Sequence, residues 1–153
     1  MKKGKTISVN RRARFDYEII DTLEAGLVLT ATEIKSIRDH RANLSGSYAY
    51  PHKGEMWLYN SHISPYPAAS YSNHEPDRTR KLLLKRDQIR RLTASLNRKG
   101  FAIIPMRLYI SGHYAKVQLG IGKGRRKRDK RREIKDRAIS REIREAGRRD
   151  FGQ

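Results

Sequence analysis

The chain ends in a strand-like segment that leads directly into a strongly cationic tail. Residues 114–122 alternate polar and apolar side chains, as in a half-buried strand whose apolar face packs on a core. From Lys123 onward, the last 31 residues include 14 Lys or Arg and six Asp or Glu, a net charge of +8. Such a segment cannot bury itself, so the sequence predicts a folded domain at 10–122 and a tail at 123–153 that meets a polyanion.

The remainder of the chain is basic as well. The whole chain carries +19, and its first 122 residues alone carry +11. Nucleic acid is therefore the leading candidate partner, because phosphates are dense, exposed anions. A membrane surface is the alternative, but the tail has no Trp and one Phe, and so lacks the bulky apolar face of an interfacial helix. No stretch approaches the roughly 20 apolar residues of a transmembrane helix.

Length and composition favour one domain with an appendage. Of the 153 residues, the ~120 before the tail can bury roughly two-thirds of their surface, enough for one core. No cysteine is present, which excludes disulfides and thiol catalysis and is typical of a cytoplasmic protein. Residues 1–9 are predicted to form a flexible basic leader. The chain begins like the cationic start of a signal peptide, but Asn10 and Arg11 interrupt the apolar run that would have to follow. We expect a cytoplasmic monomer without membrane contact.

Periodicity and turn residues predict short antiparallel strands and a few helices. Strands are expected at 15–29, 101–110 and 114–122, a hairpin at 47–63, helices at 30–41 and 85–99, and a long loop at 64–80. Gly26 suits a bulge or sharp bend that turns a barrel corner. The predicted fold class is mainly β with added α: a small, closed antiparallel barrel resembling oligonucleotide-binding barrels, with two to three short helices and a basic C-terminal tail.

The start of the predicted domain is a candidate RNA contact. Asn10 precedes Arg11, Arg12 and Arg14. Arginine can grip phosphates bidentately, and asparagine can read a base edge or a ribose. The alternative is a solvated leader, but the basic body and tail favour RNA.

Two further positions are ambiguous from the pattern alone. Glu24 is an acidic residue in a cationic protein, and it either accepts a hydrogen bond from RNA or forms a surface ion pair with a nearby arginine. Leu83 is the second of three consecutive leucines between Lys81 and Lys85. It is either core or an exposed side chain that packs on a base. The pattern alone favours an ion pair for Glu24 and a place in the core for Leu83.

The residues do not suggest catalysis or metal binding. None of the five histidines pairs with another at helical spacing, and no cysteine joins them. No Walker-type phosphate loop, Ser-His-Asp set or pair of carboxylates stands out. We expect no enzymatic activity, no cofactor and no metal site.

The tail has helical spacing without a core-sized apolar face. Isoleucines and one alanine form a thin stripe, and opposite charges recur four residues apart. Such a segment is expected to be disordered when free and helical on an anionic track. A purely solubilising, disordered tail is the alternative.

A series of short motifs occurs in one order along the chain. NRRAR is followed by EAGLVL with EIKS, then by ANLSGSYA, HISPY, RTRKLLL and KGRRKRDKRRE. This series resembles the SsrA-binding protein family (small protein B, SmpB) of bacterial trans-translation, and the resemblance covers residues 10–145. The resemblance implies an oligonucleotide-binding-like barrel that binds the tRNA-like domain of transfer-messenger RNA (tmRNA). It also implies delivery of that RNA, with elongation factor Tu and GTP, to ribosomes stalled without a stop codon, for rescue and tagging of the nascent chain.

The resemblance assigns roles to particular residues. It places RNA-binding positions on Asn10, Glu24 and Leu83, to which we add the neighbouring cations Arg11, Arg12, Arg14, Lys81 and Lys123. It places a hinge at Gly124 and the ribosome-binding motif of the tail at Asp129, Lys130 and Arg131, with Ile139 in the expected helix. This tail would enter the decoding centre of the small subunit and the empty mRNA channel. The family commonly has an aromatic residue or His before that motif, where this chain has Arg128, whose guanidinium can also stack on a base.

Two other hypotheses remain at this point. The chain is alternatively a structural ribosomal protein with a basic extension, which would stay on the subunits in high salt, whereas an adaptor would not. An RNA-modifying enzyme is a third possibility, disfavoured by the lack of a catalytic constellation.

Overall fold

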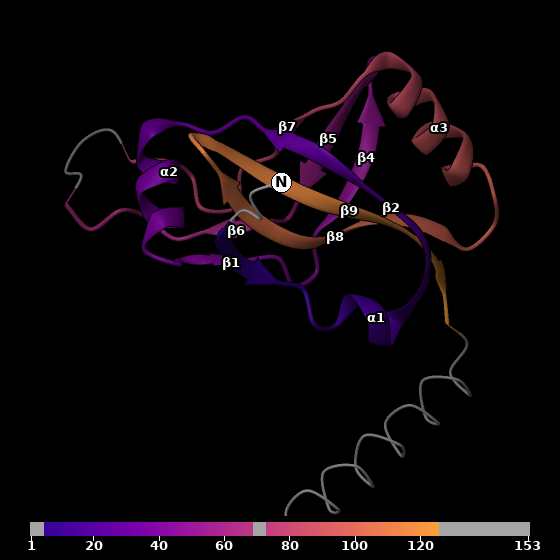
Figure 1. The fold of residues 1–153 in the computed structure, drawn as a ribbon, viewed down its shortest axis with the longest axis horizontal. Helices are drawn as coiled ribbons and strands as arrows, with labels where there is room; N and C mark the ends of the chain where they lie inside the picture. The colour runs from indigo at the N-terminus through magenta and orange to yellow at the C-terminus, as the bar shows by residue number, and fades with distance from the viewer. Residues whose placement is uncertain (1–4, 69–72, 126–153) are drawn as a thin grey trace, which may run out of the picture.

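The computed structural model describes residues 5–68 and 73–125 (Figure 1). Six strands pair antiparallel in a closed ring, in the order β8-β4-β5-β7-β2-β9 and back to β8. Their bounds are β2 Tyr17–Leu27, β4 Tyr48–His52, β5 Glu55–Tyr59, β7 Arg80–Leu83, β8 Phe101–Ser111 and β9 Tyr114–Gly124. The fold is mainly β with an antiparallel barrel, as the sequence predicts.

Within residues 5–68 and 73–125, three helices surround the barrel: α1 (Ala13–Asp16), α2 (Ala31–Arg38) and α3 (Arg86–Leu96). α2 and α3 lie within the ranges predicted from helical spacing. A separate pair of two-residue strands, β3 (Ala42–Asn43) and β6 (His62–Ile63), lies outside the ring. In the described part of the chain, none of the helices has the length and apolar character needed to cross a membrane.

The barrel interior is apolar, and β9 contributes to it as its alternation predicts. Val117 and Leu119 are fully buried and Ile121 nearly so, whereas Tyr114 on the same strand is exposed. The two hairpins turn through left-handed residues: Lys53 (φ 50°) and Gly54 (φ 78°) join β4 to β5, and Gly112 (φ 63°) joins β8 to β9. Two consecutive residues with positive φ are characteristic of a type I′ hairpin, which matches the twist of the strands.

Two expectations about the ends of the domain are wrong. Residues 1–9 were expected to form a flexible leader, but β1 (Lys5–Val9) pairs antiparallel with β8 and buries Ile7 in the core. Gly124 was expected to be a hinge beyond a boundary at residue 122, but β9 extends to Gly124, whose N–H donates to the carbonyl of Gly100 at 2.8 Å. The expectations for the tail at 126–153 lie outside the described residues.

The expected bulge at Gly26 is also in the wrong place. The register of β2 against β9 shifts between Ile19 and Asp21, not at Gly26. Gly26 instead marks the point where β2 is bonded on both sides, opposite Lys116 of β9 and Leu83 of β7. A Cβ atom at Gly26 would lie 3.2 Å from the Cβ of Leu83, so the glycine allows these two strands to approach closely.

A fully buried ion pair joins α2 to β7. Nε of Arg80 donates to Oε2 of Glu33 at 2.5 Å, and Nη1 of Arg80 donates to the carbonyl of Ser61 at 2.8 Å. The other oxygen of Glu33 accepts from Arg78 and from the backbone N–H of Thr30, which closes the capping box of α2. Burial raises the pKa of Glu33, but these hydrogen bonds outweigh it, so its pKa lies below the ordinary 4.5.

We predict that Glu33→Gln destabilises the fold by about 3–5 kcal/mol, because it leaves the buried Arg80 without its counter-charge. Urea unfolding of both proteins at neutral pH measures this difference. Glu18→Gln, at an exposed position on β2, is the matched control and should change the unfolding free energy by less than about 0.5 kcal/mol.

The same substitution should alter the pH dependence of stability. A carboxylate whose pKa is lowered by folding stabilises the protein fully above its unfolded pKa, and this stabilisation is lost as the pH falls through the folded pKa. The difference in unfolding free energy between wild type and Glu33→Gln should therefore be constant above about pH 5.5 and shrink in more acidic solution. A difference that grows on acidification would contradict a charged Glu33 in the folded protein.

Candidate nucleic-acid interface

Outward-facing side chains from four neighbouring strands meet around Gly26. In the sheet register Gly26 lies opposite both Leu83 and Lys116, and Lys116 lies opposite Tyr109. Opposed residues share one face of a sheet, so these side chains are neighbours on the outside of the barrel. We call this surface the outer strip; its members are Leu83 (β7), Glu24 (β2), Lys116 (β9), and Tyr109 and Arg107 (β8).

Glu24 is held in place by two neighbours in the outer strip. Its Oε1 accepts from Nζ of Lys116 at 2.7 Å. Hydrogen bonds from Lys116 and from Tyr109 hold the pKa of Glu24 below its usual range, so the carboxylate is ionised at neutral pH. A surface ion pair with an arginine was the alternative from the sequence; the ion pair exists, but its partner is Lys116.

Tyr109 connects the carboxylate to a guanidinium. The Arg107 guanidinium carbon lies 4.4 Å from the centroid of the Tyr109 ring, and its Nη1 donates to Oγ1 of Thr6 on β1 at 3.1 Å. Burial, together with the hydrogen bond to Glu24, raises the pKa of Tyr109 to about 12. The phenol therefore stays protonated at neutral pH and can donate to Glu24, while Arg107 presents a cation over the ring.

Leu83 adds an apolar contact to this polar surface. Its side chain is 53% exposed, whereas Leu82 beside it is buried in the barrel. The pattern alone favoured core for the three leucines, and strand alternation instead turns the middle one outward. Lys81, also on β7, is paired with Glu55 at 2.9 Å and lies opposite Trp57 of β5.

Asn10 is not an exposed amide. It is buried, and its Nδ2 donates to the carbonyls of Pro105 at 3.0 Å and Leu44 at 3.4 Å. Its backbone N–H donates to the carbonyl of Met106 at 2.8 Å. The residue thus fastens the end of β1 to β8, and this geometry does not offer the base-reading amide that the sequence suggested.

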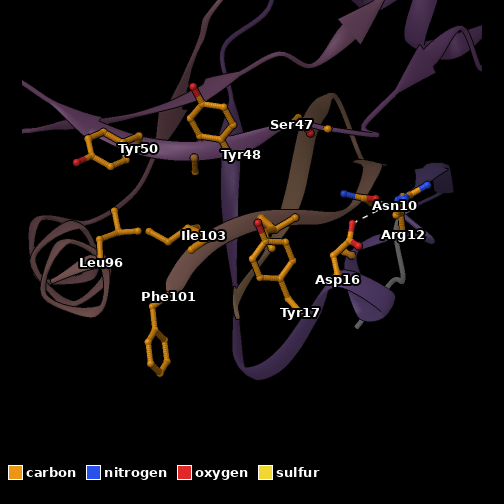
Figure 2. A pocket seen from close by; sticks show the side chains of 15 residues that line it. Asn10, Arg12, Asp16, Tyr17, Ser47, Tyr48, Tyr50, Leu96, Phe101 and Ile103 are labelled. Atoms are coloured by element: carbon orange, nitrogen blue, oxygen red, sulfur yellow. Dashed lines mark ion pairs between the residues drawn. The ribbon is translucent and has the colours of Figure 1, made fainter. Parts of the chain in front are cut away.

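The predicted cations fall into separate groups. Arg11, Arg12 and Arg14 are exposed at α1, where Nε of Arg12 lies 3.4 Å from Oδ2 of Asp16 (Figure 2). Lys123 is exposed near the end of β9, opposite Glu18. The structure thus brings Glu24 and Leu83 together in the outer strip, with Lys81 on the strand of Leu83.

Sequence reasoning missed three members of the outer strip, namely Arg107, Tyr109 and Lys116. The alternation of Arg107 and Tyr109 around the buried Leu108 was the available signal. The outward position of Lys116 was predicted, but its contact with Glu24 depends on the pairing of β2 with β9, which one sequence does not reveal. The predicted tail residues Arg128, Asp129, Lys130, Arg131 and Ile139 lie outside the described part of the chain.

Comparison with known proteins identifies the family. The family model described as "SmpB protein" matches residues 7–149. The chain belongs to the SmpB family. It is 50% identical to an SsrA-binding protein of Geobacillus thermodenitrificans over 94% of this chain and 93% of that protein. It is likewise 50% identical to one of Enterococcus faecalis over 92% of each.

A solved structure of an SmpB relative shares the fold. That structure is described as "tmRNA-SmpB: a journey to the center of the bacterial ribosome". The TM-score is 0.68 at 42% identity, over 82% of this chain and 92% of that one. Among the described residues of this SmpB-family chain, no group of three or more His, Asp or Glu could hold a metal ion.

We predict that Glu24→Gln lowers the pKa of Tyr109 from about 12 toward the ordinary value of 10, because it removes a nearby negative charge. An ultraviolet titration of tyrosinate absorbance should show one of the eight tyrosines ionising earlier than in wild type. Glu18→Gln is the control and should leave the curve unchanged. An unaltered curve for Glu24→Gln would show that Glu24 and Tyr109 are not coupled.

Proposed function

We propose that this SmpB-family protein is an RNA-binding adaptor for ribosome rescue. It binds the tRNA-like domain of tmRNA and delivers it to stalled ribosomes, where trans-translation tags the nascent chain. Membership of the SmpB family supports this function, as does the tmRNA–SmpB subject of the related structure. The observation in this chain that carries it is the outer strip, which combines a fixed carboxylate, cations and an exposed leucine on one face of a barrel.

The outer strip suits an RNA that must be recognised by shape and by particular groups. Arg107 and Lys116 can neutralise phosphates, and Glu24 can accept from a ribose hydroxyl or a base amino group. Leu83 can pack on a ribose or base. Asn10 acts as a positioning residue, because its bonds hold the end of β1 against β8, and β1 supplies Thr6 to the Arg107 guanidinium of this surface.

The cationic tail serves the ribosome in this proposal. At the start of the tail, the backbone N–H groups of Gly124 and Arg125 donate hydrogen bonds to the carbonyls of Gly100 and Asp16. Beyond them the chain has a dense run of positive charge that suits the RNA-lined decoding centre and mRNA channel. Contacts are assigned to Arg128 and to the motif Asp129, Lys130 and Arg131, with Ile139 further along.

The remaining properties follow from the adaptor role. The protein acts in the cytoplasm as a monomer, without a catalytic step of its own or a cofactor. Elongation factor Tu joins through the RNA complex.

We predict that Glu24→Ala weakens tmRNA binding by about tenfold or more, about 1.4 kcal/mol. If Glu24 acted only through its charge, its removal from a protein of net charge +19 would strengthen RNA binding. If Glu24 instead contacts the RNA directly, its removal weakens tmRNA binding. Binding is also weakened if Lys116 loses the position in which Glu24 holds it. Filter binding with purified tmRNA at fixed salt measures the change.

Glu18→Ala removes the same charge from the same strand without disturbing the outer strip, and should bind tmRNA as tightly as wild type or slightly more tightly. Circular dichroism confirms that both variants are folded. Tighter binding by Glu24→Ala would contradict the assignment of the outer strip to tmRNA.

A further inference from the structure

A second surface lies apart from the outer strip. A pocket of about 370 Å³ opens between β4, the corner from α1 to β2, the end of α3 and the start of β8. Figure 2 shows Tyr48 and Tyr50 on the β4 side, and Tyr17 and Asp16 on the side of α1 and β2. The floor is apolar and includes Ile103. A cavity of this size with apolar walls and few polar groups is typical of a small ligand site.

One wall of the pocket is an incomplete aromatic stack. The rings of Tyr48 and Tyr59 are stacked, with centroids 5.3 Å apart and planes at 15°. Tyr48 is also 42% exposed and borders the pocket, so part of its side chain remains open to a ligand there. Tyr50, 54% exposed, extends this aromatic wall along β4. A flat, aromatic ligand that entered the pocket would continue the stack.

The rim of the pocket suits a nucleotide more than another aromatic ligand. Arg12 lies at the mouth with a side chain that is 71% exposed, and a guanidinium there can bind the phosphate of an inserted nucleotide. Its ion pair with Asp16, at 3.4 Å, holds it at this place. The net charge of +19 favours a polyanionic strand as the source of that nucleotide.

The position of the pocket indicates which RNA it meets. Asp16, in its wall, accepts a hydrogen bond from the backbone N–H of Arg125 at 2.9 Å, so the tail leaves the barrel directly beside the pocket. The outer strip is built instead from β7, β2, β9 and the second half of β8. Under the proposed function, the surface at the root of the tail faces the small ribosomal subunit.

We propose that this pocket takes an unpaired nucleobase of small-subunit ribosomal RNA, stacked on Tyr48, with its phosphate on Arg12. The inference rests on the proposed function, because it takes the tail to be directed into the small subunit. Stacking on an aromatic ring is tolerant of base identity and contributes ~1–3 kcal/mol per base, which corresponds to about 5- to 150-fold in affinity.

The test is the binding of the preformed tmRNA–protein complex to purified small ribosomal subunits, using the full chain. Tyr48→Ala should weaken this binding at least about fivefold, while its affinity for tmRNA alone stays within about twofold of wild type. Tyr48→Phe keeps the ring and should restore subunit binding. Tyr114→Ala is the matched control, because Tyr114 is 72% exposed at the β8–β9 turn, away from the pocket, and should bind like wild type.

Three results would overturn the proposal. Subunit binding unaffected by Tyr48→Ala would show that the pocket holds no ribosomal base. An equal loss of tmRNA affinity in Tyr48→Ala would assign the pocket to tmRNA instead. A loss of subunit binding in Tyr48→Phe would show that the hydroxyl, and not stacking on the ring, makes the contact. Failure of the proposed function itself is distinct, because wild type would then bind neither tmRNA nor subunits.

Discussion

The barrel closes through β8, and one edge of this strand is shared between two partners. On one side β8 pairs with β9 along its length; on the other, Ile103 pairs with Ala49 of β4, and residues 107–110 pair with β1. The change of partner occurs where the register shifts, around Met106. Asn10 fills this point by donating to the carbonyls of Pro105 and Met106. Both candidate surfaces depend on this junction.

From the junction, the chain leads to each surface in turn. Before Asn10, β1 lies beside Arg107 and supplies Thr6 to its guanidinium, which belongs to the outer strip. After Asn10, α1 carries Arg12 and Asp16 to the mouth of the pocket. A single buried amide therefore sets the geometry of two surfaces. Its loss would disturb both, so Asn10 is better understood as a positioning residue than as a reader of bases.

The sequence predicted the fold because its strong signals are local. Alternation in β9, the capping box at Thr30 and Glu33 and the helical spacing of α3 depend on neighbouring residues and agree with the structure. The site was predicted less completely, since its contacts cross strands. Lys116 meets Glu24 only through the pairing of β2 with β9, and a leader rich in lysine becomes β1 only because β8 has a free edge. The motif resemblance supplied Glu24 and Leu83, which composition and spacing had assigned to an ion pair and to the core.

In the proposed function, the barrel binds tmRNA, and the tail is required for tagging on the ribosome. The most direct test is a chain truncated after Arg125, which keeps all of β9 and its bond to Asp16. Its affinity for tmRNA and its peptide tagging on stalled ribosomes would be measured beside those of the full chain. We expect the truncated chain to bind tmRNA with an affinity within about tenfold of that of the full chain, a difference of less than about 1.4 kcal/mol, and to lose tagging. A truncated protein that still tags, or one that no longer binds tmRNA although folded, would contradict it.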